Sequence, residues 1–250
     1  AAVVGGGIAN GSGASIVNVT NSTISGNSAQ SGGGIFTNGA VTVRSSTITA
    51  NSATNEGGGI SNFTSEAVSL GNTIVAGNSA PVAPDFRDTL TSLGYNLIGN
   101  ASGAIIAGDP TGNILNQNAL LSSLLNNGGT TPTHALLPNS PAVNAGTSTN
   151  APATDQRGRP RVGQVDIGAY EFPPTLVVTK TADTNDGTCD ADCSLREAVT
   201  AAASGDLILF ASPLFDTPQT VQTNGQIIID KILTIAGRGA NLTTVQNVAP

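Results

Sequence analysis

The sequence contains no methionine and no tryptophan, and only 3% of its 250 residues are aromatic. Charged residues are also scarce at 10%, and nine basic residues stand against sixteen acidic ones. Proteins that bind the phosphate backbone of nucleic acid need a basic surface, so this composition argues against nucleic acid as a partner. No apolar run reaches the roughly 20 residues that a helix needs to cross a bilayer. We therefore expect no membrane span, and a core built from aliphatic side chains.

Glycine is abundant instead, with 31 residues, and it marks an internal repeat. Three landmarks recur at steps of 24 to 27 along the chain: Gly-Gly-Gly-Ile at 5–8, 32–35 and 57–60, Thr-Ile at 23–24, 47–48 and 73–74, and Asn-Ser-Ala at 27–29, 51–53 and 78–80. Between the landmarks, apolar and polar residues alternate, as in Val41-Thr42-Val43, which is the period of a strand with one buried face. A repeat of this length with several short strands predicts one coil of a parallel β-solenoid.

Stacking of such coils makes two further predictions about the repeat. Equivalent residues lie about 4.8 Å apart in successive coils, so Asn27, Asn51 and Asn78 are expected to form a structural hydrogen-bonded ladder. The glycine triplets are expected where the backbone turns too sharply for a Cβ atom. A disordered Gly/Ser/Asn linker is the alternative, but a linker has no reason to keep valine and isoleucine in phase with its turns.

Non-repeating motifs that follow the coils carry a resemblance to a known family. They are Thr-Pro-Thr-His-Ala-Leu at 131–136, Ser-Pro-Ala-Val-Asn-Ala-Gly at 140–146, Thr-Asp-Gln-Arg-Gly-Arg-Pro-Arg at 154–161 and Asp-Ile-Gly-Ala-Tyr-Glu at 166–171. With the coils, residues 1–172 resemble bacterial surface proteins of the choice-of-anchor Q kind, although Asn144 stands where that family usually has aspartate. The resemblance implies an all-β fold, a right-handed parallel β-helix of the pectin-lyase-like superfamily, and the repeat gives it about 25 residues per coil. It also implies that Asp155, Arg157, Asp166 and Glu171 form a structural, ion-paired turn that closes the last coil.

Residues 173–250 carry a second resemblance. Cys-Ser-Leu-Arg-Glu-Ala at 193–198 is the signature of the CSLREA domain, and a strand-like run at 176–179 precedes it, as is usual in that family. Ser194 and Glu197 have the spacing of a capping box, which predicts one short helix near 194–204. We expect this helix to cap the open end of a solenoid, and the apolar runs between 226 and 245 to be the first coils of a following solenoid.

The order of the two segments is reversed relative to the proteins that they resemble, in which the CSLREA segment comes first and the anchor-Q ending last. Joining residue 250 to residue 1 restores the usual order. We therefore interpret the chain as one period cut from a tandem or head-to-tail array, whose partners are copies of itself. A naturally permuted gene is the alternative. The lack of methionine fits a mature product or a piece of a longer polypeptide.

The segment before the predicted helix contains the only two cysteines and a cluster of acidic residues. Cys189 and Cys193 fit one local disulfide in an oxidising compartment, with two reduced thiols as the alternative. Five oxygen-bearing side chains lie within ten residues, which suits calcium, the one cofactor that the sequence suggests: Asp183, Asn185, Asp186, Asp190 and Asp192. The spacing is not that of an EF-hand, and a solvated acidic loop pinned by the two cysteines is the alternative.

Many right-handed β-helices cleave polysaccharides, which requires clustered carboxylates or a basic residue beside bound calcium. Residues 1–80 hold only three charged residues. The single histidine, His134, lies in the non-repeating motifs at 131–171, here called the ending motif, and we expect it to make a structural hydrogen bond. We therefore expect no enzyme, but a structural subunit of a secreted extracellular fibre or cell-surface appendage, assembled head to tail. A surface adhesin that binds cell-surface polysaccharide is the alternative, followed by a polysaccharide lyase or hydrolase.

Overall fold

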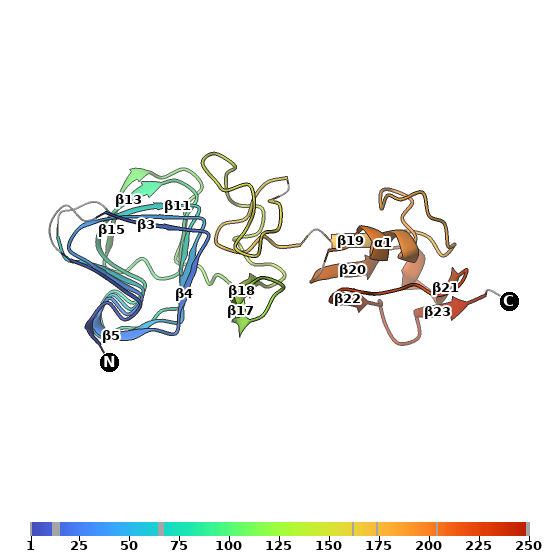
Figure 1. Cartoon of the computed structure of the whole chain (residues 1–250), viewed down its shortest axis with the longest axis horizontal. Coiled ribbons are helices and arrows are strands. Elements are labelled where there is room, and N and C mark those ends of the chain that lie inside the picture. The colour runs from blue at the N-terminus through green and yellow to red at the C-terminus, as the bar shows by residue number, and fades with distance from the viewer. Residues whose placement is uncertain are drawn as a thin grey trace. The chain divides into compact units, whose positions relative to one another are not determined.

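The computed structural model describes residues 2–11, 16–64, 68–161, 163–173, 175–203 and 205–248. The chain forms two compact units, residues 1–172 and residues 173–250, and nearly all of its regular structure is β (Figure 1). In the described residues of the first unit the strands are β1 (Ala2–Val4), β2 (Ile8–Asn10), β3 (Ile16–Thr20), β4 (Thr23–Ser25), β5 (Ser28–Ser31), β6 (Ile35–Thr37), β7 (Ala40–Arg44), β8 (Thr47–Thr49), β9 (Ser52–Glu56), β10 (Ile60–Asn62), β11 (Val68–Gly71), β12 (Ile74–Val75), β13 (Phe86–Leu93), β14 (Leu97–Ile98), β15 (Ala104–Asp109), β16 (Ile114–Leu115), β17 (Leu121–Leu125) and β18 (Thr133–Leu136).

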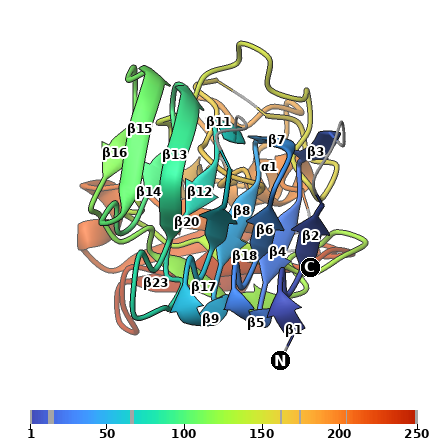
Figure 2. The same ribbon diagram turned by 90° about the vertical axis from the view of Figure 1, so that its left-hand side faces the viewer.

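The strands of the first unit stack as a parallel β-solenoid, as the repeat predicts. Strands one coil apart are neighbours, in the orders β1-β5-β9, β2-β6-β10-β13, β3-β7-β11-β13 and β4-β8-β12-β14-β16, and Figure 2 shows the last of these rows side by side. Through the first three coils, paired residues are 24 to 27 positions apart, as in Val17 with Val41 and Ile8 with Ile35. The next coils are shorter, since Ile74 pairs with Leu97 and Leu97 with Ile114.

The predicted alignment of the three Thr-Ile pairs is wrong by one residue in the third coil. Thr23 pairs with Thr47, but Thr47 pairs with Ile74 rather than with Thr73. Thr73 takes the place of Ser46, and the hydroxyl groups of both bond to backbone carbonyls two residues earlier, at Gly71 and Arg44. Ile74 therefore points out of the coil, and Val75 points inward beside Ile48.

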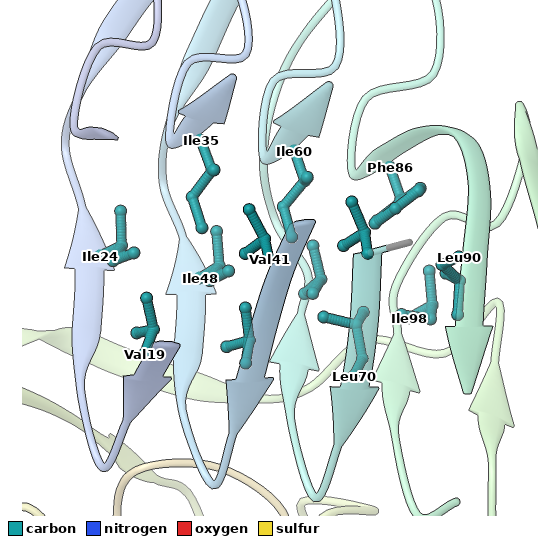
Figure 3. Close-up of a cluster of buried hydrophobic side chains, with 13 residues drawn as sticks. Val19, Ile24, Ile35, Val41, Ile48, Ile60, Leu70, Phe86, Leu90 and Ile98 are labelled. Atoms are coloured by element: carbon teal, nitrogen blue, oxygen red, sulfur yellow. The ribbon is translucent and has the colours of Figure 1, made fainter. Parts of the chain in front are cut away.

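The core of the solenoid consists of aliphatic rows that run from coil to coil. Ile24, Ile48, Val75 and Ile98 form one row by register, and Ile35, Ile60 and Phe86 form another. Figure 3 shows the side chains of both rows, apart from Val75, inside the coil. Ile35, Ile48, Ile60 and Phe86 are fully buried. Burial of one such side chain contributes about 1.5–3 kcal/mol, so the rows supply the main driving force for stacking.

The glycine triplets form a corner at which successive coils touch through their backbones. The first glycine of each triplet has a positive φ, at 60° for Gly5, 67° for Gly32 and 61° for Gly57, which disfavours other residues. At the second position a Cβ atom on Gly33 would overlap the carbonyl oxygen of Ser52 and stand 2.5 Å from that of Gly58. Only glycine fits both positions, as the sequence predicts.

The second unit is a smaller parallel β structure with one helix. Its elements are β19 (Thr175–Val178), α1 (Leu195–Ala201), β20 (Asp206–Phe210), a 3₁₀ turn (Leu214–Asp216), β21 (Gln219–Thr223), β22 (Leu233–Ala236) and β23 (Thr243–Asn247). The strands pair in the orders β19-β20-β22 and β21-β23. The apolar face of α1 packs on a core that includes Val178, Ile208 and Phe215. The predicted helix near 194–204 is present, although residue 204 lies outside the described residues, whereas residues 226–230 are not a strand.

No helix within the described ranges is both long and apolar enough to cross a membrane.

Candidate functional site

The predicted asparagine ladder is present at the corner next to the glycine triplets. The backbone amide and the side-chain Nδ2 of Asn27 both donate to Oδ1 of Asn51, at 3.0 and 2.9 Å. Asn51 repeats this pattern on Oδ1 of Asn78, at 3.0 Å for both bonds. Asn51 is only 1% exposed, so each amide satisfies polar backbone groups that water does not reach. The ladder is a structural element that fixes the register of the coils.

Asp85 ends this ladder, and the sequence did not reveal its role. The backbone amide and Nδ2 of Asn78 donate to Oδ1 of Asp85, both at 2.9 Å, and the amide of Asn100 donates to Oδ2 at 2.7 Å. Burial raises the pKa of the Asp85 carboxyl, and the bonds from Asn78 and Asn100 partly offset this rise. Because Asp85 follows Asn78 by seven residues instead of a full coil, the repeat period could not predict it.

Two ion pairs within the ending motif are buried. The guanidinium of Arg157 lies 2.7 Å from Oδ2 of Asp155 and stacks on the ring of Tyr170, with 3.6 Å from its central carbon to the ring centroid. Both charged side chains are 0% exposed. Arg161 pairs with Glu171 at 3.0 Å, and these side chains are also nearly inaccessible to water. The residues predicted to form an ion-paired structural turn are therefore brought together.

Asp166 belongs to the same network. Its carboxyl bonds to backbone amides and forms no ion pair among the contacts described. Its Oδ1 accepts the amide of Asn144 at 2.6 Å, and its Oδ2 accepts the amide of Phe172. The amide of Asp166 in turn donates to Glu171 at 3.1 Å. Burial raises the pKa of Asp166 to about 7. The carboxyl thus bonds to two backbone amides of this segment, those of Asn144 and Phe172, which is a structural role.

The ending motif lies along the side of the coils, and the prediction that it closes the last coil is wrong. Asn21 in the first coil donates to the carbonyl of Thr154 at 2.6 Å, and Asn72 in the third donates to that of Thr147 at 2.6 Å. In the second coil Thr47 accepts the amide of Ala169 at 3.1 Å. The outward residues Ile74 and Leu97 pack under this segment in a second apolar cluster with Ile167 and Tyr170. Covering these apolar side chains is the physical reason for the lateral position.

His134 attaches the hairpin of β17 and β18 to the first coil. Its Nδ1 is 2.7 Å from the carbonyl oxygen of Ser122, so Nδ1 carries a proton, because a carbonyl only accepts. Its Nε2 is 2.7 Å from the hydroxyl of Ser25 in β4. The imidazole is 6% exposed and bridges two segments that are far apart in the sequence. This arrangement is the structural hydrogen bonding that we expected for His134.

The predicted disulfide between Cys189 and Cys193 is present, with 4.5 Å between the Cα atoms. The acidic side chains around it are engaged separately. Asp183 pairs with Arg196 at 2.7 Å, which lowers the pKa of that carboxyl, and Asp192 pairs with Lys180 at 2.9 Å. Asp186 accepts the amide of Thr188, Asp190 accepts the amide of Asp192, and no contact is described for Asn185. In the part of the chain that the structure describes, no three His, Cys, Asp or Glu side chains are placed to hold a metal ion.

Glu197 is the central acceptor of the segment that leads into α1. Its Oε2 accepts the amide of Ser194 at 2.6 Å, and its Oε1 accepts the amide of Asp186 at 3.0 Å. The hydroxyl of Ser194 accepts the amide of Glu197 at 3.1 Å, which completes the predicted capping box. The bond from the Ser194 amide, above all, lowers the pKa of Glu197 from 4.5 to about 2.

We expect this carboxylate to make the second unit acid-sensitive. Because the pKa is depressed in the folded state, the stabilisation is complete above about pH 4.5 and is lost as the pH falls towards 2. Glu197→Gln should lower the free energy of unfolding at pH 7 by about 1–3 kcal/mol, since the amides of Ser194 and Asp186 lose a charged acceptor. It should also remove part of the decline in the free energy of unfolding between pH 4.5 and 2. Thermal unfolding at pH 7, 4.5, 3 and 2, followed by circular dichroism, measures both effects.

The matched control for this experiment is Asp230→Asn, since that side chain is 78% exposed. The control should keep the stability and the acid dependence of the unchanged chain. The same acid dependence in Glu197→Gln and in the unchanged chain would contradict the role of this carboxylate.

A polar groove of about 610 Å³ lies on the first unit. It is lined by Arg44, Thr91, Ser92, Leu93, Tyr95, Gly108, Asp109, Thr111, Thr147, Thr149 and Asn150. One aromatic ring, one cation, one carboxylate and several hydroxyl and amide groups are the donors, acceptors and stacking surface that a sugar ring can use. Sequence reasoning missed this groove, because its residues come from four separate segments.

Both units have open sheet edges among the strands that the structure describes. In the first unit β1, β2 and β3 have a strand neighbour on one side only, and Val3 and Ile16 are 67% and 69% exposed there. In the second unit β22 and β23 are edge strands, and Ile228 and Val245 are 70% and 53% exposed. Natural proteins usually protect such edges with charge or proline. The first charged residue of this chain is Arg44, so the edge of β1, β2 and β3 has no charged residue of its own.

Comparison of this chain with protein-family models, with curated proteins and with solved structures found no match.

Proposed function

We propose that this protein is a structural subunit of a secreted extracellular fibre or cell-surface appendage, in which solenoid units assemble head to tail. The observation that carries the proposal is the open parallel sheet edges of the two units, of which the edge of β1, β2 and β3 has no charged residue of its own. Each edge exposes backbone donors and acceptors next to apolar side chains, the combination that adds further strands. A second copy of the chain offers strands of matching direction and composition, and stacking would cover the exposed valines and isoleucines.

The polar networks support a structural rather than a catalytic function. The charged side chains of the ending motif, Asp155, Arg157, Asp166 and Glu171, bind one another and the backbone of their own segment. We also propose that the chain is a surface protein of the choice-of-anchor Q and CSLREA kind, because its motifs resemble those of the two families. The disulfide supports an oxidising compartment, and hence secretion.

Electron microscopy of the native, undenatured material tests this proposal. We expect filaments with a regular axial repeat of tens of Å, because stacked coils advance by about 4.8 Å each. Sedimentation should show that the filaments grow with protein concentration. Discrete monomers at all concentrations would overturn the proposal.

A second candidate function rests on the polar groove, which favours an adhesin that binds cell-surface polysaccharide. We expect binding of that kind to appear on a glycan array and to fall at least ten-fold in Tyr95→Ala, which removes the stacking ring. The control is Thr244→Ala, an exposed change in the other unit. An array on which the unchanged chain binds no glycan would exclude this candidate.

A further inference from the structure

A tyrosine occupies a corner of the solenoid where the backbone conformation does not favour it. One corner residue in each successive coil has a left-handed backbone, with φ of 49° at Asn21, 46° at Ser45, 49° at Asn72, 57° at Tyr95 and 66° at Gly112. The amides of the first four donate along this row to the following coil. Asparagine and glycine tolerate the left-handed region, whereas bulky residues rarely adopt it. Strained residues of this kind cluster at ligand-binding and active sites, so Tyr95 is a candidate for a function beyond packing.

The next residue of this corner row makes room for the Tyr95 ring. A Cβ atom on Gly112 would overlap the ring, so the ring lies over that glycine. The tyrosine is partly exposed, and it lines the polar groove of about 610 Å³. Gly112 therefore provides the space that lets an aromatic ring form part of the groove.

Arg44 brings a cation without a protein partner to the same groove. Its side chain is partly exposed, and among the contacts of the described residues it forms no ion pair and no hydrogen bond. Most other arginines pair with a carboxylate: Arg87 with Glu56, Arg157 with Asp155, Arg161 with Glu171, Arg196 with Asp183 and Arg238 with Asp216. The guanidinium of Arg44 is thus available to an anion from outside the chain.

The register of the strands separates Arg44 from the carboxylate of the groove. Arg44 in β7 pairs with Gly71 in β11, and Asp109 in β15 pairs with a residue of β13, the strand next to β11. Three strand steps therefore separate the backbones of Arg44 and Asp109, or about 14 Å at 4.8 Å per step. A Cβ atom on Gly71 would stand 3.3 Å from Nη1 of Arg44, so the guanidinium lies over that glycine. Asp109 instead accepts the amide of Thr111 at 2.9 Å. The cation and the carboxylate are two separate binding groups.

One wall of the groove is held in place by the corner row. Thr147, Thr149 and Asn150 of the ending motif form this wall. Nδ2 of Asn72 donates to the carbonyl of Thr147 at 2.6 Å, and its Oδ1 accepts the amide of Thr147 at 2.9 Å. A site that is already ordered loses little conformational entropy on binding. A ligand would therefore meet fixed hydroxyl and amide groups in addition to the ring and the cation.

We propose that this groove binds a saccharide that carries carboxylate groups, with Arg44 paired to a carboxylate and Tyr95 stacked on a sugar ring. The inference rests on the second candidate function and specifies its ligand class. A guanidinium binds a carboxylate through two parallel N–H bonds, and a neutral sugar offers no such partner. The sugar hydroxyl groups suit Asp109, which accepts hydrogen bonds, and the threonine hydroxyl groups, which both donate and accept.

A glycan array with neutral, uronic-acid and sialic-acid oligosaccharides of matched size tests the ligand class. We expect the full chain to bind carboxylated glycans. Reduction of their carboxylates to alcohols should weaken binding about ten-fold or more, because the partner of the guanidinium is lost. The two kinds of acidic sugar identify the source of the carboxylate.

Arg44→Gln tests the role of the cation. Its affinity for carboxylated glycans should fall about ten-fold or more, to that for the reduced glycans. Arg238→Gln is the matched control, since it removes a cation that is 40% exposed in the other unit, and it should bind as the unchanged chain does. Tyr95→Asn restores the corner residue of the first and third coils, so circular dichroism should show an intact fold while binding also falls about ten-fold or more.

The outcomes separate this inference from the function on which it rests. Equal binding of carboxylated and reduced glycans, or unchanged binding in Arg44→Gln, would overturn the carboxylate assignment and leave the polysaccharide adhesin standing. Binding of poly-glutamate without binding of any glycan would overturn both, and so would an array on which no glycan binds.

Discussion

Replacing Gly33 by alanine is expected to destabilise the first unit strongly. The added Cβ atom would overlap the carbonyl oxygen of Ser52 and lie 2.5 Å from that of Gly58. Both oxygens belong to the backbone of the next coil. The amide of Gly34 donates to the carbonyl oxygen of Gly58 in that coil at 3.0 Å. Relief of the overlap would require the coils to move apart, which breaks this bond and the packing of Ile35 and Ile60. We expect a loss of about 3 kcal/mol or more.

Urea unfolding followed by circular dichroism measures this loss. Gly11→Ala is the matched control, since a Cβ atom there would meet nothing within 4 Å. Its midpoint should stay within the small change expected for an exposed position. If Gly33→Ala and Gly11→Ala unfold at the same urea concentration, the close contact of the coils at this corner is not essential.

The other large effect is expected for Arg157→Ala. The substitution leaves the carboxylate of Asp155 buried without its cation, and it removes the bond from Arg157 to the carbonyl of Glu171 at 2.5 Å. It also removes the stacking on Tyr170. Breaking a buried ion pair by removal of one partner typically costs about 3–5 kcal/mol. We therefore expect the ending segment to detach from the coils, or the first unit to unfold.

Hydrogen–deuterium exchange of residues 140–172, together with the urea midpoint, would report this change. Arg238→Ala is the comparison, because its pair with Asp216 is 2.6 Å long but about 40% exposed on both sides. Exposed pairs contribute about 0–1 kcal/mol, so this variant should remain close to the unchanged chain. Equal stability of the two variants would mean that the buried pair contributes no more than a surface pair.

Most of the repeat could be predicted from the sequence, because each landmark has a local physical reason. Gly32 and Gly33 occupy a corner with no space for a side chain, and Asn51 bonds to the same atom types one coil before and one coil after. Ser194 and Glu197 are likewise a local pattern. Such features depend on spacing along the chain, which the sequence displays directly.

The parts that could not be predicted depend on contacts without a period. The Thr-Ile pair at 73–74 is out of register by one residue. Thr73 occupies the position that Ser46 has in the coil before, and its hydroxyl makes the same bond to the carbonyl two residues earlier. The position of the ending segment is set by Ile74 and Leu97, which are apolar where the first coils have Thr23 and Thr47. This change from threonine to aliphatic residues on the outer face was the one signal in the sequence that a covering segment packs there.

The ending segment also acts as a molecular ruler for the first unit. It bonds to Asn21 in the first coil, Thr47 in the second and Asn72 in the third. A coil inserted between these residues would displace the first of them by about 4.8 Å and break its bond to Thr154. A solenoid can in principle gain or lose whole coils during evolution without harm to its core. Here the segment along the side of the coils holds that number constant.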